Sequence, residues 1–173
     1  MSLILTDASP SDAEELLAIY APYVENTAIS YEYVPPTAEE FRRRIEKVLT
    51  AYPYLTVRED GHILGYAYAS RFKERKAYDR SVELSVYVRA DCRGRGIGRM
   101  LYTEMEKRLP ACGVTNLYAC IAVPSLEKGP DEYASYDSVR FHTAMGYAMV
   151  GRFAGCACKF GRVYDMVFME KRI

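Results

Sequence analysis

A short segment rich in glycine and arginine carries the clearest chemical signal in the 173-residue sequence. Gly94, Gly96 and Gly98 lie at the start of an amphipathic segment that predicts a helix. Glycine lets the backbone approach a ligand closely, and the free N–H groups of a first helical turn suit a phosphate. One guanidinium group can donate two parallel hydrogen bonds to phosphate oxygens. The segment holds four arginines, at positions 89, 93, 95 and 99. It predicts a site for a pyrophosphate-bearing ligand, with a solvated glycine-rich turn as the alternative.

The spacing of these glycines excludes two common phosphate loops. The chain has no Gly-Lys-Ser or Gly-Lys-Thr, so the turn is not a Walker loop, and it lacks the G-x-G-x-x-G spacing of dinucleotide folds. It follows a predicted strand at 81–88, in which apolar residues alternate with Glu83, Ser85 and Tyr87. A helix is expected from Ile97, with apolar residues at helical spacing as far as Leu109. The unit is therefore strand, glycine turn, helix.

The remaining pattern predicts a single α/β domain with a mixed sheet. Ser11 with Glu14, and Thr37 with Glu40, have the spacing of capping boxes, which begin a helix to about Tyr20 and a second helix through Leu49. An Asp-Gly pair predicts a hairpin between strands 55–58 and 63–70. The other expected elements are a strand at 3–5, a strand at 117–123, a polar loop at 124–136, a helix from Asp137 or Ser138 to Gly146, and strands at 147–153 and 163–170.

Composition excludes several classes of protein. The 23 basic and 23 acidic side chains cancel, so no overall field attracts nucleic acid or an anionic membrane. No apolar run approaches the length of a membrane span, and the first residues have neither a secretory nor a transit pattern. The five cysteines favour reduced thiols in the cytoplasm, and Cys156-Ala157-Cys158 is interpreted as two small residues rather than a metal or redox pair.

Several motifs occur in the order found in one known family. The pattern Arg93-x-x-Gly96-x-Gly98 resembles the acetyl-CoA pyrophosphate loop of the GNAT acyltransferase superfamily. Further segments are similar to phosphinothricin N-acetyltransferases and their methionine-sulfoximine-acetylating relatives, namely 65–70, 83–88, 138–142 with 146–147, and 159–162. The resemblance covers nearly the whole chain. It implies an α/β fold with a mixed, mostly antiparallel central sheet flanked by helices, in one GNAT domain over residues 1–173.

Glu83 and His142 are the expected catalytic residues. An amine is mostly protonated at neutral pH, so a base must remove a proton before or during attack on a thioester. Glu83 lies on the polar face of an apolar strand, where partial burial would raise its pKa. The resemblance implies that it is this base, the alternative being a glutamate paired with a nearby arginine. The resemblance also implies that His142 is the general acid for the departing thiolate or a proton relay, whereas His62 is assigned to the surface.

The resemblance further implies acetyl-CoA as co-substrate, with direct transfer that needs neither a metal nor a nucleophilic cysteine. In this arrangement Tyr87 and Val88 contact the pantetheine arm, and a backbone N–H near Val86 holds the thioester oxygen. The residues expected to bind the rest of the cofactor are Arg93, Gly94, Arg95, Gly96, Ile97, Gly98 and Arg99.

The resemblance implies that the basic segment 71–80 lines the acceptor pocket, and a carboxylate or phosphinate acceptor needs such positive partners. Arg75, Lys76 and Ala77 are its expected contacts, and Tyr31, Glu32 and Tyr33 are expected to cover the pocket; an ordinary solvated loop is the alternative for the basic segment. The chain departs from the resembling family after Pro124-Ser125, where residues 126–136 form an insertion. The family's usual asparagine contact to the cofactor is thereby put in doubt.

The sequence thus predicts an acetyl-CoA-dependent N-acetyltransferase acting on the amino group of a small amino-acid-like acceptor of the phosphinothricin or methionine sulfoximine type. The mechanism expected is direct attack in a ternary complex, in a cytoplasmic protein that forms a homodimer. One alternative is a GNAT enzyme acting on a polyamine, an antibiotic or a protein N-terminus. The other is a non-catalytic sensor that binds CoA.

Overall fold

The computed structural model describes residues 2–127, 129 and 131–173, so residues 128 and 130 of the expected insertion lie outside the described residues. The helices are α1 (Ala13–Asn26), α2 (Ala38–Leu49), α3 (Ile97–Arg108) and α4 (Asp137–Ala144). The strands are β1 (Ile4–Asp7), β2 (Tyr54–Glu59), β3 (His62–Arg71), β4 (Ser81–Val88), β5 (Asn116–Pro124), β6 (Ala148–Lys159) and β7 (Arg162–Arg172).

The strands form one sheet in the order β1-β2-β3-β4-β5-β7-β6. Neighbouring strands are antiparallel except β4 and β5, which are parallel and are joined through the crossover helix α3. A parallel pair requires such a crossover, because its strands run in the same direction. The predicted fold class, a mixed and mostly antiparallel sheet flanked by helices, is confirmed.

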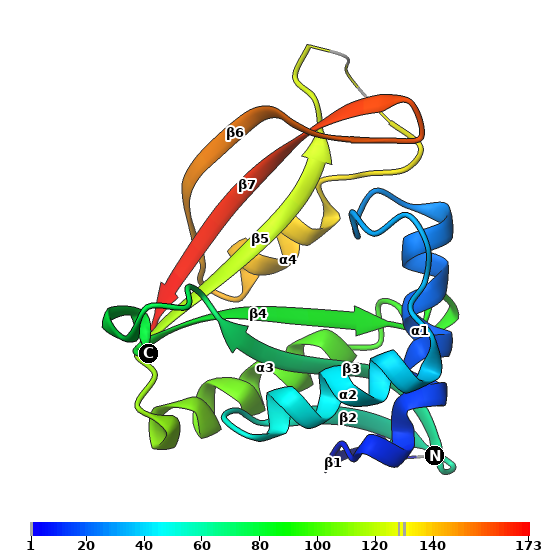
Figure 1. Ribbon diagram of the computed structural model, residues 1–173, viewed down its shortest axis with the longest axis vertical. Helices are drawn as coiled ribbons and strands as arrows, with labels where there is room; N and C mark the ends of the chain where they lie inside the picture. The colour runs from blue at the N-terminus through cyan, green and yellow to red at the C-terminus, as the bar shows by residue number, and fades with distance from the viewer. Residues whose placement is uncertain (1, 128, 130) are drawn as a thin grey trace.

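The parallel pair is very short, and this opens the sheet. β4 and β5 pair only from Ser81↔Asn116 to Glu83↔Tyr118. Beyond Glu83 the two strands diverge, and Figure 1 shows the sheet split into two arms. We call β1–β4 the N-terminal arm and β5, β7 and β6 the C-terminal arm. Among the residues that the structure describes, the edge of β4 that faces this gap has no strand partner after Glu83.

Different helices cover the two faces of the N-terminal arm. α1 and α2 lie on one face and α3 on the other (Figure 1). On the α1 face, the rings of Tyr66 and Tyr87 lie with their centroids 5.4 Å apart, and Tyr20 meets Tyr87 edge-on at 5.0 Å. On the α3 face, apolar side chains from α3 pack against Leu84 and its neighbours. The alternation along β4 therefore sends Glu83, Ser85 and Tyr87 away from α3.

The start and end of α1 differ from the prediction. A 3-10 turn at Pro10–Asp12 leads into α1, and it is this turn that carries the capping box, made by Ser9 and Asp12, whose carboxylate accepts from the Ser9 amide at 2.9 Å, and not by Ser11 with Glu14. The helix continues past Tyr20 and through Pro22 to Asn26. An interior proline is costly, but Tyr23 and Val24 beyond it are buried, and this burial favours the additional turn.

The other corrections are at strand ends. The predicted strand at 147–153 is the first part of β6, which continues to Lys159 through two register shifts and includes both Cys156 and Cys158. The side chains of β6 are mostly exposed, so the sequence has no hydrophobic alternation that would indicate its full length.

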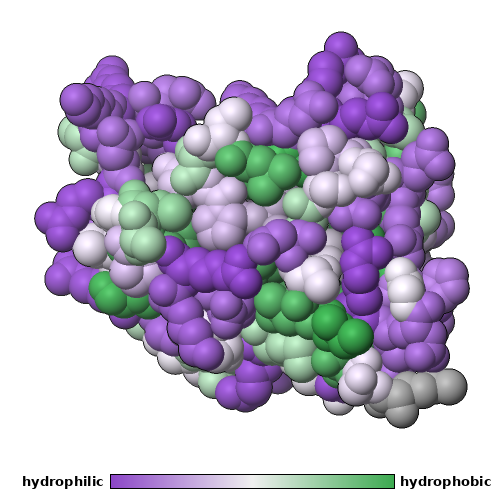
Figure 2. Space-filling model, turned by 90° about the horizontal axis from the view of Figure 1, so that it is seen from below, coloured by the Kyte–Doolittle hydropathy of each residue, from purple (hydrophilic) through white to green (hydrophobic). Residues whose placement is uncertain are grey.

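Seen from below, the surface of the molecule is mainly hydrophilic, with smaller hydrophobic patches between (Figure 2). Within the described ranges, no helix has the length and apolar character needed to cross a bilayer.

Candidate active site

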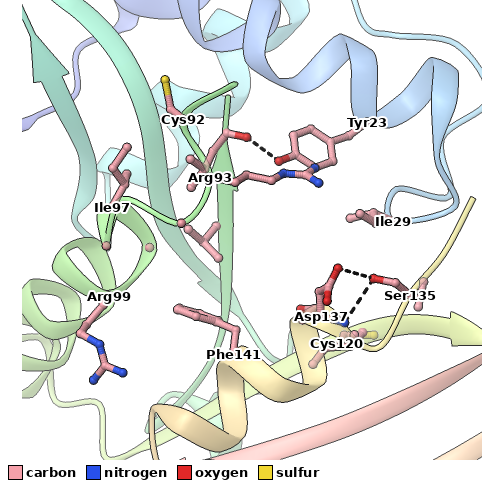
Figure 3. A pocket seen from close by; sticks show the side chains of 18 residues that line it. Tyr23, Ile29, Cys92, Arg93, Ile97, Arg99, Cys120, Ser135, Asp137 and Phe141 are labelled. Atoms are coloured by element: carbon pink, nitrogen blue, oxygen red, sulfur yellow. Dashed lines mark hydrogen bonds between the residues drawn. The ribbon is translucent and has the colours of Figure 1, made fainter. Parts of the chain in front are cut away.

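A cavity of about 540 Å³ lies between the glycine turn and the C-terminal arm. Figure 3 shows Tyr23 and Arg93 together on one wall and Ser135, Asp137 and Phe141 on another. Residues from α1, β4, the glycine turn, α3, β5 and α4 line this cavity. Its lining residues are Tyr23, Ile29, Val86, Val88, Cys92, Arg93, Gly94, Gly96, Ile97, Gly98, Arg99, Cys120, Ile121, Ala122, Ser135, Asp137, Ser138 and Phe141.

The glycine turn presents the start of α3 to this cavity. Gly96 is the N-cap of α3 and has a φ of +81°, in the left-handed region that favours glycine. No side chain caps the helix, and its first turn has no acidic residue. The amides of Ile97, Gly98 and Arg99 therefore lack intrahelical acceptors. Together with the positive end of the helix dipole, they form a site suited to an anion.

The four arginines of the turn have different partners. Arg95 makes a two-pronged ion pair with Glu59, at 2.6 and 3.0 Å, and is not among the cavity-lining residues. Arg89 pairs with Asp91 in the same way. Arg93 and Arg99 line the cavity, and the Arg93 guanidinium lies 5.3 Å from the centroid of the Tyr23 ring. Two of the four positive charges are thus directed to a ligand.

The free edge of β4 forms a second wall. The Tyr23 hydroxyl donates to the Val88 carbonyl at 2.5 Å, and the Tyr102 hydroxyl lies 3.3 Å from the Leu84 carbonyl. Between these two carbonyls, Val86 faces the gap beyond the end of the β4–β5 pairing. Its amide and carbonyl are placed to bond an extended chain laid along the strand. The Tyr87 ring, in contrast, packs on the α1 face, and its carbonyl lies on the β3 side of the strand near Gly65, so its expected contact with the pantetheine arm stays a prediction.

Glu83 lies at the vertex of the gap, because it is the last β4 residue paired with β5. Its side chain is on the α1 face, whereas Val86 and Val88 line the cavity from the other, so the gap connects the two. Burial raises the pKa of Glu83, and the Lys73 ammonium opposes this more weakly. Burial first, and then the Glu83 carboxylate, raise the pKa of the cavity-lining Cys120 to about 12. A raised pKa suits a base at neutral pH.

His142 is buried behind the cavity wall and is only 3 % exposed. Its Nδ1 donates to the Ser138 carbonyl at 2.7 Å, so Nε2 is left to accept from the Tyr102 hydroxyl at 2.9 Å. Burial lowers the pKa of His142 and so favours the neutral ring. The hydrogen bond to the Ser138 carbonyl acts in the opposite direction, but its effect on the pKa is smaller. The described lining of the cavity includes neither His142 nor the fully buried Tyr102. The catalytic role of His142 stays a prediction.

The expected acceptor residues lie outside the cavity. Arg75, Lys76 and Ala77 are exposed at a short 3-10 turn. The half-buried Tyr31 extends its hydroxyl to within 3.4 Å of the Asp165 carbonyl, and Glu32 pairs with Arg44 at 2.5 Å. The contact of these residues with an acceptor stays a prediction.

Sequence reasoning missed the cavity residues contributed by distant elements. Tyr23 and Ile29 come from α1 and the segment after it, and Cys120 from β5. No local pattern marks them, since they meet the glycine turn only through the fold. Ser135, near the end of the insertion, and Asp137, the first residue of α4, supply polar groups to the cavity. A serine two residues before an acidic helix start is the one signal that could have indicated them.

Helix amides and arginines beside an exposed strand edge, with a half-buried carboxyl group where two strands part, form an arrangement suited to an acyltransferase that uses a CoA thioester. The comparisons agree, since the acetyltransferase (GNAT) domain family matches residues 5–168. The chain belongs to this family, so the predicted acetyl-CoA-dependent acyltransferase is confirmed.

Individual relatives are also similar over nearly the full chain. A phosphinothricin N-acetyltransferase of Alcaligenes faecalis is 35 % identical over 161 residues, covering 92 % of this chain and 77 % of the relative. An L-methionine sulfoximine/L-methionine sulfone acetyltransferase of Pseudomonas aeruginosa is 30 % identical, covering 98 % of this chain and 94 % of the relative. The solved structure of a phosphinothricin acetyltransferase from Sinorhizobium meliloti in complex with AcCoA superimposes with a TM-score of 0.88 at 33 % identity, covering 100 % of this chain and 89 % of that one.

Proposed function

We propose that the protein transfers the acetyl group of acetyl-CoA to the amino group of a small amino-acid-like acceptor of the phosphinothricin or methionine sulfoximine type. The similarity to acetyltransferases with these named substrates supports the acceptor class. The observation that carries the proposal is the position of Glu83, a half-buried carboxyl group at the vertex where the β4–β5 pairing ends, with a pKa that burial raises.

The residues of the cavity fit acetyl-CoA. The free amides of α3 and the guanidinium groups of Arg93 and Arg99 suit the diphosphate, with Gly94 and Gly96 letting the backbone approach. The edge of β4 at Val86 suits the pantetheine arm, and its amide suits the thioester oxygen. Since Arg95 is bound by Glu59, it acts on the phosphates through the overall charge of the turn.

Glu83 accepts the proton that the acceptor's ammonium group must lose. The amine nitrogen then bonds to the thioester carbonyl carbon, the carbon–sulfur bond breaks, and the sulfur leaves with the electron pair. As the amide forms, the nitrogen loses a second proton, and this proton neutralises the thiolate. His142, whose free Nε2 can take up a proton and release it again, and Tyr102 relay it, and the hydrogen bond between them supports the role. Direct transfer needs no cysteine nucleophile, and the raised pKa of Cys120 disfavours its thiolate as one.

The acceptor enters from the α1 face, opposite the cofactor. Arg75, Lys76 and Ala77 supply the basic rim for its carboxylate or phosphinate, and Tyr31 and Glu32 cover it. Lys73, which influences the pKa of Glu83, belongs to the same basic segment and supports this placement.

The active molecule is a homodimer in the cytoplasm, with no nucleic-acid or membrane partner. Exposed apolar side chains along the C-terminal hairpin support pairing with a second copy; they are Met149, Val150, Phe153 and Val163. The net charge of zero supports the absence of a nucleic-acid or membrane partner, and the free cysteines support the cytoplasmic location.

A thiol-release assay tests the proposed function. Wild-type protein should release CoA with phosphinothricin or methionine sulfoximine, and much more slowly with polyamines. Glu83→Gln should lose about 10²-fold or more in kcat and keep its affinity for acetyl-CoA. Release of CoA only with a polyamine or a protein N-terminus would favour the alternative acceptors. A protein that binds acetyl-CoA but releases none with any amine would be a sensor.

A further inference from the structure

Lys159 closes β6 at the tip of the C-terminal hairpin, and the proposed chemistry does not use it. It is only 2 % exposed. Its ammonium donates to the carbonyls of Val24 at 2.6 Å, Thr27 at 2.8 Å and Ser30 at 2.6 Å. An ammonium has three N–H groups, so every donor is used. All three acceptors lie at the end of α1 or in the segment that leads to α2, which we call the bridging segment (residues 27–37).

The location suits a buried cation. The last carbonyls of a helix have no intrahelical partner, and the helix dipole is negative at this end. A buried charge is costly unless it is well hydrogen-bonded, and here three converging carbonyls satisfy it. Lys159 therefore fixes the end of α1 and the first residues of the bridging segment to the hairpin with charge-assisted hydrogen bonds, which are stronger than neutral ones.

These bonds join the two arms at their open end. α1 packs on the N-terminal arm, whereas the hairpin belongs to the C-terminal arm, and Figure 1 shows the bridging segment beside the hairpin where the arms are far apart. Weaker contacts follow the same path: the Tyr33 hydroxyl donates to the Cys158 carbonyl at 2.6 Å, and the Ala28 amide to the Tyr133 carbonyl at 2.9 Å. At the vertex, the arms are joined by the short β4–β5 pairing and by contacts beside it, such as the stacked rings of Phe72 and Tyr118.

The bridging segment also supplies residues to both sides of the gap. Ile29 lines the cavity, and Tyr31 and Glu32 lie at the proposed acceptor side. We propose that Lys159 is a positioning residue that sets the opening between the arms by holding the bridging segment to the C-terminal hairpin. Its effect on acceptor binding rests on the proposed function, whereas its effect on the bridging segment and on acetyl-CoA binding does not.

Lys159→Met is the direct test, because it keeps the length of the side chain and removes all three donors. Hydrogen exchange in peptides spanning 27–34 should become about tenfold faster while the core of β3 and α3 keeps its protection. The acceptor KM should rise about tenfold with less than about threefold loss of kcat, because Glu83 stays in place. Acetyl-CoA affinity should fall severalfold, because Ile29 lines the cavity and lies in the segment that Lys159 holds. Lys47→Met, at an exposed lysine of α2, is the matched control and should change none of these values.

A second variant keeps the test decisive if Lys159→Met does not fold. Tyr33 is 70 % exposed, so Tyr33→Phe should fold normally while losing one contact between the same segments. It should shift exchange and acceptor KM in the same direction, by about two- to threefold. Wild-type values in the folded variants, or faster exchange spread evenly over the whole chain, would overturn the proposal. If wild-type protein acetylates no acceptor, the proposed function fails, and exchange and acetyl-CoA affinity still decide the role of Lys159.

Discussion

The arginines of the glycine turn have different roles, which their shared residue type does not reveal. Arg93 lies in the cavity, with its guanidinium over the Tyr23 ring, whereas Arg95 is held by Glu59 outside it. The sequence predicts a concentration of positive charge and cannot divide that charge between ligand and protein. The division depends on Glu59, in a strand far from the turn along the chain.

Arg93→Gln and Arg95→Gln form a matched pair at this scale. Arg93→Gln removes a direct partner of the diphosphate, so the Kd for acetyl-CoA should rise about tenfold or more. Arg95→Gln loses a partly exposed ion pair and should change the Kd by less than about threefold. Calorimetric titration of both variants measures the difference. Equal losses would mean that only the total charge of the turn matters.

Glu83 gives the reaction a predicted pH dependence. Burial raises its pKa, and because a base must be deprotonated, kcat/KM should fall as the pH drops through this raised value. The Lys73 ammonium lowers the same pKa, so Lys73→Met should move the acid limb to higher pH. The shift should be about a few tenths of a pH unit, since Lys73 is exposed. A pH–rate profile with Lys47→Met as control tests this, and a limb that moves to lower pH would contradict it.

At the scale of elements, the position of α3 depends on how closely it approaches β3. A Cβ on Gly65 would lie 2.9 Å from the Ile97 side chain and 3.0 Å from the Tyr87 carbonyl. The strand, turn and helix around the glycine turn could be predicted from local pattern, because alternation and helical spacing are local. The close contact between Gly65 and Ile97 could not, since the two positions meet only in the folded sheet.

Gly65→Ala should therefore displace the start of α3. The overpacked contact should lower the free energy of unfolding by about 1–3 kcal/mol and weaken acetyl-CoA binding as the amides of Ile97 and Gly98 move. Gly151→Ala in β6, where an added Cβ meets nothing within 4 Å, is the control. Denaturant unfolding and calorimetry measure the two effects. Unchanged acetyl-CoA affinity in a destabilised Gly65→Ala protein would separate the helix position from binding.

At the scale of the whole molecule, two arms meet at Glu83 and are held at the other end by the bridging segment. The fold class and the family could be predicted, because the motifs follow one another in order along the chain. The composition of the cavity could not be predicted, because Tyr23, Cys120 and Ser135 are far apart along the chain and come together only in the folded protein. The C-terminal arm is tied internally by Asp165, a 1 % exposed carboxylate that accepts from Arg152 at 2.6 Å and from the Gly155 amide at 2.8 Å.

Asp165→Asn should lower the free energy of unfolding by about 3–5 kcal/mol, because it leaves the Arg152 charge without its partner. Burial alone would raise the pKa of Asp165, but the Gly155 amide and Arg152 outweigh it and the pKa is lowered. The carboxylate's stabilisation is therefore present above its unfolded-state pKa of about 3.9 and is lost as the pH falls through the lower folded-state value. Denaturant unfolding at several pH values should show the two proteins converging in acid. A constant difference would contradict this origin.

A crystal structure of the protein with acetyl-CoA would test the placement of the reaction most directly. The diphosphate should lie within hydrogen-bond distance of the first amides of α3 and of Arg93, with the thioester oxygen at the Val86 amide. The acetyl carbon should then face Glu83 through the gap between β4 and β5. A cofactor bound outside this gap, or an acetyl group separated from Glu83 by intact sheet, would contradict it.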